Sequence, residues 1–161
     1  MDRVGFVTLQ AECREDCRLA MAAAKVAADR YACGTDAGLE AAAFHLARFF
    51  NIVEQMSLRV AKAFENHIDR DHGWHAQLLR RLSIAVPGIR PALFTPEFMP
   101  WIHDLRGFRH IVNHAYDLKL ERARCAHVLE NAEKIAATLP GLLKSFMAQV
   151  GRENGWNDVG E

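Results

Sequence analysis

The sequence predicts an all-α protein, folded as one antiparallel helical bundle of about five to six helices. Apolar residues recur every three or four positions along most of the 161 residues, which is the spacing of amphipathic helices. No segment sustains the alternation of apolar and polar residues that marks a half-buried strand. Hydrophobic residues make up 50 % of the chain, which is enough for one core in a chain about one domain long.

The first two predicted helices form an antiparallel hairpin. One runs from about Arg3 to Tyr31 and ends before Gly34, a residue type that favours helix ends. Thr35 or Asp36 caps the second, because either side chain can accept a hydrogen bond from the free amides of the first turn. The apolar stripes comprise Phe6, Leu9, Cys13, Ala20, Ala24, Ala27 and Tyr31 in the first helix, and Leu39, Ala42, Leu46, Phe49, Val53, Met56, Val60 and Phe64 in the second.

A polar connection over residues 66–75 is rich in residue types that bind metal ions. They are His67, Asp69, Asp71, His72 and His75. Their spacing matches no strong zinc signature, and the four cysteines lack the paired C-x2-C spacing of a zinc site. Cys13 and Cys17 lie four residues apart, which also permits a metal, but ordinary reduced thiols are the simpler interpretation. We predict no metal site and no cofactor.

The middle of the chain is less regular. A short third helix is predicted over residues 74–84. Residues 86–94 then cross back irregularly, because their prolines oppose a helix while their apolar side chains reach the core. Thr95 followed by Pro96 indicates a helix start, with Thr95 as N-cap, and Pro100 is expected to restart or kink that helix.

The last helical region begins near Glu121 and places apolar residues at helical spacing. These are Cys125, Val128, Leu129, Ala132, Ile135 and Leu139. Pro140–Gly141 is predicted to break or kink it, and a further helix covers Leu142–Val150. Residues 1–150 then form a single domain, and residues 151–161 have the composition of a flexible C-terminal tail.

The charge composition limits the classes of function. Lys and Arg together number 20, as do Asp and Glu, so the formal net charge is zero. No global basic field attracts nucleic acid, and any RNA contact must come from a local cluster. The N-terminus lacks a secretory-signal pattern and no apolar run reaches membrane-spanning length, so we expect a cytoplasmic protein with no membrane contact.

The segment His103–Leu118 is the strongest functional candidate. At about 100° per residue, its side chains separate into a polar and an apolar arc. The polar arc holds His103, Arg106, Arg109, His110, Asn113, His114, Tyr116 and Asp117. The apolar arc holds Leu105, Phe108, Ile111, Val112, Ala115 and Leu118, with Asp104 as the one charge. The polar arc lacks the Lys and Glu of an ordinary solvated face, which indicates a binding surface.

Arg109 and His114 carry the chemistry that phosphodiester cleavage needs. Arginine offers a rigid fork of donors that fits a phosphate, and histidine exchanges a proton near neutral pH. The two residues are separated by about 140° on an ideal helix, at opposite edges of the polar arc. One chain does not easily place both on one phosphate. We therefore expect a homodimer whose two-fold axis brings Arg109 of one chain near His114 of the other.

The same segment resembles a known family. Arg109, His114 and Tyr116 form an R-x4-H-x-Y motif, preceded by the letters LRGFRH that include the arginine. Together with the upstream Trp74-His75 and the run PGIRPA at residues 87–92, the motif resembles the HEPN superfamily. The resemblance is specifically to the HepT-like ribonuclease toxins of prokaryotic toxin–antitoxin pairs, and it extends over most of the chain from the second helix onward.

The resemblance implies a HEPN-like bundle and a dimeric, metal-independent endoribonuclease with Arg109 and His114 in a site between subunits. It also implies a partner, a minimal nucleotidyltransferase antitoxin that transfers AMP onto the motif tyrosine, here Tyr116. The family often has a small polar residue after the arginine, whereas this chain has His110, so either His110 or His114 can be the acid or base. Supporting contacts to the RNA are expected from Arg106, His110 and Asn113.

Two other interpretations stay open. A non-catalytic HEPN module would hold a nucleotide or a partner protein on the polar arc without cleaving RNA. Such a module predicts ligand-dependent stabilisation and no turnover. A structural dimerisation protein would instead bury an Arg–Asp–His network on that face, such as Arg106 or Arg109 with Asp117. That interpretation predicts that Arg109→Ala unfolds the protein or dissociates the dimer.

Overall fold

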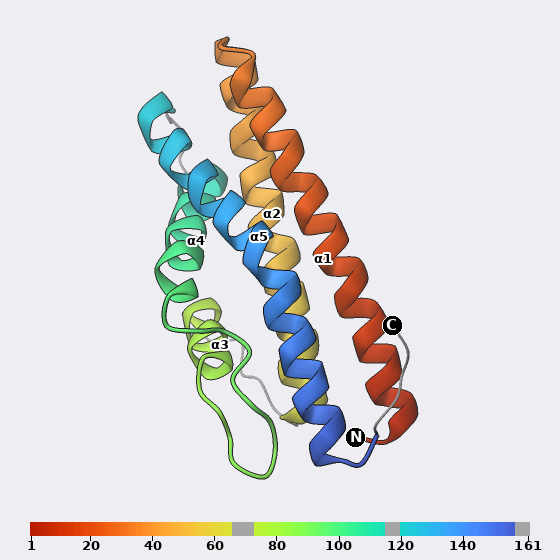
Figure 1. Ribbon diagram of the computed structural model, residues 1–161. Coiled ribbons are helices and arrows are strands. Elements are labelled where there is room, and N and C mark those ends of the chain that lie inside the picture. Colours follow the sequence, from red (N-terminus) through yellow and green to blue (C-terminus); the bar gives the residue numbers. More distant parts are fainter. Residues whose placement is uncertain (66–72, 115–119, 157–161) are drawn as a thin grey trace.

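The computed structural model describes residues 1–65, 73–114 and 120–156, and these ranges contain five helices (Figure 1). The helices are α1 (Arg3–Ala32), α2 (Asp36–Phe64), α3 (Trp74–Leu82), α4 (Phe98–His114) and α5 (Arg122–Glu153). α1 and α2 form a long antiparallel hairpin, and α5 packs along both. α4 packs against α2 and α5, and α3 packs on α2. The all-α helical bundle predicted from the sequence is confirmed.

The turn between α1 and α2 follows from three small residues. Gly34 adopts a φ of 73°, a conformation that favours glycine. Thr35 is the N-cap of α2, since its Oγ1 accepts a hydrogen bond from the amide of Gly38 at 3.0 Å. A Cβ on Gly38 would lie 2.6 Å from the carbonyl oxygen of Arg30, so the two helices approach closely here because residue 38 has no side chain.

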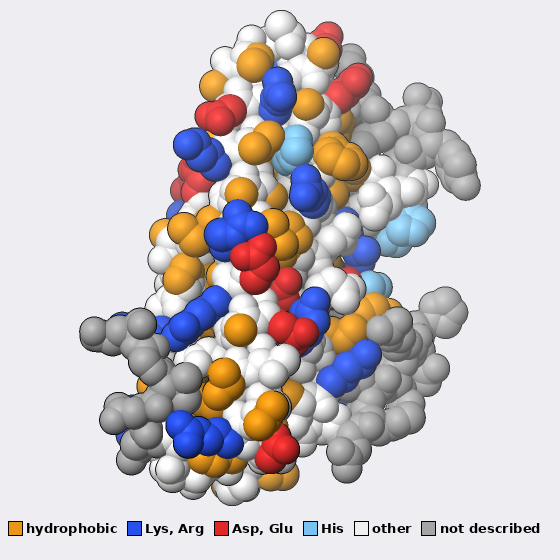
Figure 2. Space-filling view, turned by 90° about the vertical axis from the view of Figure 1, so that its right-hand side faces the viewer, with side chains coloured by type: hydrophobic (Ala, Val, Ile, Leu, Met, Phe, Trp, Pro, Cys, Tyr) orange, Lys and Arg blue, Asp and Glu red, His pale blue; other side chains and the backbone are white. Residues whose placement is uncertain are grey.

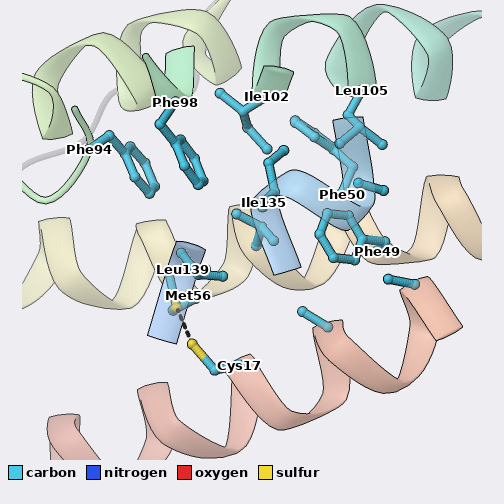
Figure 3. Packing of buried hydrophobic residues seen from close by; sticks show 14 of the residues in the cluster. Cys17, Phe49, Phe50, Met56, Phe94, Phe98, Ile102, Leu105, Ile135 and Leu139 are labelled. Carbon is cyan, nitrogen blue, oxygen red and sulfur yellow. Dashed lines mark hydrogen bonds between the residues drawn. The ribbon is translucent and has the colours of Figure 1, made fainter. Parts of the chain in front are cut away.

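One hydrophobic core contains residues of all five helices (Figure 3). The residues predicted as apolar stripes of α1, α2 and α5 are buried, or packed against the buried cluster in the case of Tyr31 and Phe64. α4 contributes Phe98, Ile102 and Leu105, which lie on the side of the core opposite α1. This packing fixes the rotation of α4 about its axis and so decides where its polar side chains point.

The cysteines are free thiols. Cys13, Cys17 and Cys125 are buried, and Cys33 is exposed. Burial raises the pKa of Cys13 to about 12 and that of Cys17 to about 11, so both thiols are protonated at neutral pH. The Sγ of Cys17 lies 3.8 Å from the Sδ of Met56 (Figure 3), as expected for a thiol that acts as a packing residue.

α4 begins later than the sequence predicts. Thr95 is not its N-cap: residues 95–97 form a turn in which the amide of Phe98 donates to the carbonyl oxygen of Thr95 at 3.1 Å. Pro100 is the third residue of the helix and does not restart it. The first four amides of a helix have no partner within the helix, so a proline at this position costs no hydrogen bond.

The predicted interruption at Pro140–Gly141 is wrong, because α5 runs through it to Glu153. Pro140 is exposed, so water can reach the carbonyl group that the proline leaves without a partner. Leu139 and Leu143 are buried beside it and hold the helix against the core. Tertiary packing therefore outweighs the helix-breaking tendency of the proline.

The segment predicted as a flexible tail is helical and packed in its first residues. Gly151 to Glu153 complete α5, and the amide of Trp156 donates to the carbonyl oxygen of Gly151 at 2.8 Å. The ring of Trp156 lies 5.1 Å from that of Phe6, centroid to centroid. The predicted boundary at residue 150 is early, since an aromatic contact with α1 holds the chain beyond it. Residues 157–161 lie outside the described ranges.

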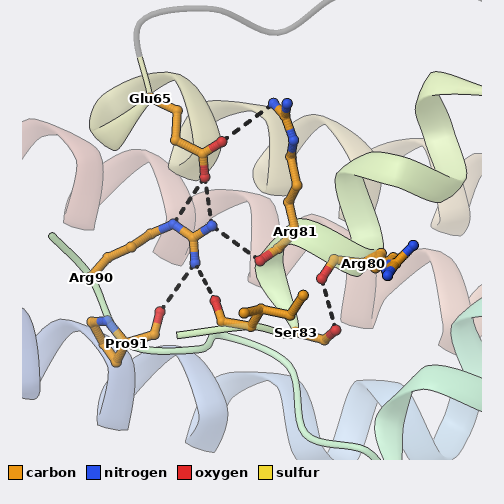
Figure 4. Close-up of polar contacts among 7 residues, drawn as sticks. Glu65, Arg80, Arg81, Ser83, Arg90 and Pro91 are labelled. Atoms are coloured by element: carbon orange, nitrogen blue, oxygen red, sulfur yellow. Dashed lines mark hydrogen bonds and ion pairs between the residues drawn. The ribbon is translucent and has the colours of Figure 1, made fainter. Parts of the chain in front are cut away.

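A buried arginine holds the connection between α3 and α4 (Figure 4). The side chain of Arg90 is 1 % exposed, and its Nε and Nη2 donate to Oε1 of Glu65 at 3.1 and 2.5 Å. Its remaining donors bond the carbonyl oxygens of Ile84, Pro91 and Arg81 at 2.9, 3.3 and 3.1 Å. All five N–H groups of the guanidinium therefore have an acceptor. This network joins the irregular segment to the last turn of α2.

The surface shows no concentration of one charge on the face seen in Figure 2, where basic and acidic side chains alternate. This distribution agrees with the zero formal net charge. Within residues 1–65, 73–114 and 120–156, no helix is long and apolar enough to cross a membrane.

Candidate functional site

Arg109 points inward, toward α2 and α3, rather than outward on an open polar face. Its side chain is 16 % exposed, and its guanidinium carbon lies 5.1 Å from the ring centroid of Phe50. Nη2 lies 4.0 Å from Oε1 of Glu54 on α2 and 3.5 Å from both ring nitrogens of His75 on α3. Three helices thus meet at this arginine. The helical periodicity of α4 alone did not predict this inward direction of Arg109, because α3 covers part of the polar face that the periodicity left exposed.

Glu54 and His75 form a pair beside the arginine. Glu54 is 5 % exposed, and its Oε1 makes a short hydrogen bond with Nδ1 of His75. The ring of Trp74 lies 4.0 Å from that of His75, centroid to centroid, and limits its movement. A buried carboxylate, a histidine and an arginine are therefore in contact at the junction of α2, α3 and α4.

The donors of Arg109 are incompletely used. Its Nε is buried and has no hydrogen-bond partner among the described residues. Its contacts with Glu54 and His75 are long, at 4.0 and 3.5 Å. A buried guanidinium whose N–H groups lack good acceptors is costly for a protein unless another molecule provides them. The arrangement therefore suits an anion that arrives from outside.

His114 lies elsewhere on α4. His110, Asn113 and His114 are exposed, the rings of the two histidines stack at 4.5 Å, and Nδ1 of His114 lies 2.9 Å from the carbonyl oxygen of His110. Arg109 contacts neither histidine ring, so within one chain the structure does not bring the predicted phosphate-binding and proton-transfer residues together.

Two other buried polar atoms, one on α4 and one on α2, also lack partners among the described residues. Nε of Arg106 and Nδ1 of His45 on α2 are buried without a hydrogen-bond partner among the described residues. Burial lowers the pKa of His103, and the charge of Arg106 lowers it further. Burial likewise lowers the pKa of His45, with Arg48 and Arg30 adding to the effect. The face predicted to bind substrate therefore contains two arginines, Arg106 and Arg109, whose buried Nε atoms have no acceptor among the described residues.

The predicted apolar arc of α4 is only partly correct. Leu105 and Phe108 are buried, but Ile111 is 43 % exposed. Asp104, the one charge of that arc, lies at the α4–α5 boundary, where its carboxylate lies 2.9 Å from Nε2 of His127 and accepts from Asn131 at 3.0 Å. The C-terminal end of α4 therefore exposes an apolar side chain next to two histidines, unlike an ordinary solvated helix face.

Some predicted residues cannot be placed. Tyr116 and Asp117 lie outside the described residues, as do His67, Asp69, Asp71 and His72. The role of Tyr116 as the AMP acceptor therefore stays a prediction, as does the place of Tyr116 and Asp117 on the polar arc. In the described ranges, no group of three or more His, Cys, Asp or Glu side chains could hold a metal ion.

A family model described as HepT-like protein matches residues 41–150, more than half of the chain. The chain belongs to the HepT-like family. The match confirms the resemblance to HEPN-superfamily proteins and spans every residue of the site, from Glu54 on α2 to His114. No curated protein and no solved structure matches the chain.

Glu54 was not among the predicted site residues, and His75 was named there only as a possible metal ligand and as part of the family resemblance. Glu54 falls within the apolar stripe of α2, directly after the buried Val53 and two residues before the buried Met56. A carboxylate on the core side of a helix is rarely left without a partner, and this position was the available signal. Its partner could not be found from the sequence, because the link to His75 depends on how α3 packs on α2.

Proposed function

We propose that this HepT-like protein is a metal-independent endoribonuclease in which Arg109 binds the scissile phosphate. The proposal is carried by one observation: Arg109 is largely buried, yet its donors are incompletely satisfied within the chain. A phosphodiester offers the two acceptor oxygens that the guanidinium fork fits. As negative charge grows on the phosphate during cleavage, the buried setting strengthens its interaction with the arginine.

The second part of the proposal is a homodimer that combines Arg109 of one chain with His114 of the other. In this scheme His114 removes the proton from the ribose 2′-OH or protonates the leaving 5′-oxygen, and His110 can take either role. The products are a 2′,3′-cyclic phosphate and a 5′-hydroxyl. The proposal is supported by the separation of the two residues within one chain and by the exposed Ile111, which a partner chain would cover. Arg106 and Asn113 would orient the RNA.

The third part concerns regulation. A nucleotidyltransferase antitoxin would transfer AMP from ATP onto the hydroxyl of Tyr116, releasing pyrophosphate. The attached phosphate lies two residues from His114 in sequence and carries the charge that Arg109 binds, so it would exclude the RNA phosphate. An intact-mass comparison with and without the transferase and ATP tests this. A gain of one AMP that Tyr116→Phe abolishes is the expected result, and an unchanged mass contradicts it.

The ribonuclease is tested by cleavage of RNA with purified Arg109→Ala and His114→Ala variants. Each is expected to lose about 10²–10³-fold in rate, since one phosphate contact or one acid–base group is worth this much. Thermal unfolding of the same samples shows whether the variants are folded. Wild-type cleavage rates in both variants would rule out the assignment.

The alternative is a non-catalytic module that binds a nucleotide or a partner. It is favoured by the same separation of Arg109 from His114, because binding an anion requires Arg109 alone. The two functions differ in a simple measurement. A binding module gains thermal stability from a mononucleotide and leaves RNA intact, whereas the ribonuclease also converts an oligoribonucleotide into products with cyclic phosphate ends.

A further inference from the structure

Arg109 has a second histidine beside it, which the R-x4-H motif does not contain. We propose that His75 is a catalytic residue of this site: Glu54 holds its Nδ1, and its Nε2 takes the proton from the ribose 2′-OH next to the phosphate that Arg109 binds. This inference rests on the ribonuclease function proposed above. It assigns the role of general base to a residue on α3, whereas the sequence left this role open between His110 and His114.

The contact with Glu54 fixes the state of the imidazole. A carboxylate accepts a hydrogen bond and does not donate one, so Nδ1 of His75 carries the proton in the pair. In the neutral ring the lone pair is then on Nε2, which is the form that a general base requires. Because Glu54 is 5 % exposed, water does not compete strongly for its carboxylate.

The position of Arg109 leaves Nε2 accessible. Nη2 of Arg109 lies 3.5 Å from both ring nitrogens of His75. An atom at equal distance from both nitrogens in the ring plane would overlap a ring carbon, so Nη2 lies over the face of the ring. Apart from this long contact with Arg109, Nε2 has no hydrogen-bond partner among the described residues, and the side chain is 29 % exposed, so that a substrate can reach it.

The charges around His75 suit a bound phosphate. Glu54 faces it from α2 and Arg109 from α4, while its neighbour on α3 is the uncharged ring of Trp74. Proton uptake by His75 adds a positive charge next to Arg109, and the phosphate anion and Glu54 both stabilise that charge. An arginine that binds the phosphate at this position also places the adjacent ribose near His75, because the 2′-oxygen is close to the phosphorus in RNA.

The reaction balances with two proton transfers. The O2′–H bond breaks and its proton goes to Nε2 of His75, while O2′ bonds to phosphorus. The bond between phosphorus and O5′ breaks, and O5′ takes a proton from a histidine in its protonated form, His114 or His110. The chain therefore offers one imidazole for each transfer. The products remain a 2′,3′-cyclic phosphate and a 5′-hydroxyl.

The test compares two histidines that each bind a carboxylate. His75→Asn places an amide N–H near the position of Nδ1, so it can keep the bond to Glu54 while removing Nε2. The matched control is His127→Gln, which keeps an N–H near Nε2, where His127 meets Asp104. Rates of RNA cleavage are measured for both variants, and for Arg109→Ala, between about pH 5 and 9, across the range in which histidine titrates.

His75→Asn is expected to cleave about 10²–10⁴-fold more slowly and to lose the rise in rate with pH that the base causes. His127→Gln is expected to match the wild type. A rate for His75→Asn within about twofold of the wild type overturns the inference, and so does a slower rate with an unchanged pH profile, since that indicates a purely structural role. If Arg109→Ala cleaves like the wild type, or the wild type does not cleave, the proposed function itself fails.

Glu54→Gln keeps the inference testable if His75→Asn does not fold. A glutamine can offer Nδ1 either an oxygen or an N–H, so the ring is no longer held with its proton on Nδ1 and its lone pair on Nε2, and the plateau rate falls. A plateau rate equal to that of the wild type contradicts the role of the pair.

Discussion

Arg90 and Arg109 are both largely buried arginines next to a glutamate, Glu65 at the C-cap of α2 and Glu54 within α2, but their surroundings differ. The side chain of Arg90 is 1 % exposed, and each of its five N–H groups has an acceptor, including Glu65 and three backbone carbonyls. The side chain of Arg109 is 16 % exposed, its Nε has no partner among the described residues, and it meets Glu54 only at 4.0 Å.

The difference separates an arginine that stabilises the fold from one that is available to bind. The desolvation of Arg90 is offset by hydrogen bonds within the chain, so its guanidinium has nothing left to offer a ligand. Arg109 is desolvated without equivalent bonds, and this costs stability in the free protein. Strain of this kind is often found at functional sites, where a ligand supplies what is missing. Substitutions at the two arginines should therefore have opposite effects on stability and on activity.

The largest effect on stability is expected from Arg90→Met. Removing the guanidinium takes away the donors that Arg90 provides to Oε1 of Glu65 and to the carbonyl groups of Ile84, Pro91 and Arg81, so the free energy of unfolding should fall by about 3–5 kcal/mol. Urea unfolding followed by circular dichroism measures the change. A loss below about 1 kcal/mol would show that the network contributes little to stability.

Arg109→Met is expected to separate activity from stability. The methionine keeps the apolar packing over Phe50 and removes a charge that is poorly paired. We therefore expect the free energy of unfolding to change by less than about 1 kcal/mol, while RNA cleavage falls about 10²–10³-fold. Unfolding and cleavage are measured on the same preparation. A destabilisation as large as that of Arg90→Met would mean that Arg109 is a structural residue, as in the dimerisation interpretation.

A smaller effect concerns pH. Burial lowers the pKa of His45 and His103 in the folded protein below the ordinary value of 6.5. Between the two values the unfolded chain binds more protons, so stability is complete above about pH 6.5 and declines as the pH falls. The decline should be weaker in His103→Gln. Urea midpoints at about pH 7.5 and 5.5 provide the comparison, and an equal decline in wild type and variant would contradict it.

The smallest effect is expected from Asp104→Asn. This carboxylate lies 2.9 Å from Nε2 of His127 and 3.7 Å from an Nη of Arg124, but its side chain is 37 % exposed, so water screens these contacts. The free energy of unfolding should change by less than about 1 kcal/mol. A small change would contrast with that of Arg90→Met. It would indicate that the burial of an ion pair, rather than its number of partners, determines its contribution to the free energy of unfolding. A loss above about 2 kcal/mol would contradict this.

Much of the fold follows from local sequence signals. The apolar spacing predicts the hairpin and the part of α5 before Pro140, and Thr35 with Gly34 marks the turn. The errors occur where tertiary contacts outweigh local preference. Pro140 is accommodated because the neighbouring leucines are buried, and the end of α5 is extended by the contact of Trp156 with Phe6. No local pattern contains that information.

The site was predictable in part. The motif identifies Arg109 and His114, and the helix phase gives their separation along α4. The inward direction of Arg109 and its contact with Glu54 and His75 depend on residues 34 and 55 positions away in sequence, brought together by packing of three helices. A charged residue in the stripe of α2 signals that a partner exists, but it does not identify that partner.

The central claim is that Arg109 of one chain and His114 of the other complete one RNA-cleaving site. It is tested most directly by mixing Arg109→Ala with His114→Ala after unfolding and refolding them together. Half of the dimers are then mixed, and each mixed dimer has one intact site of two, so about a quarter of the wild-type cleavage rate should return. Mixed dimers that form but remain as inactive as either variant alone would contradict the account.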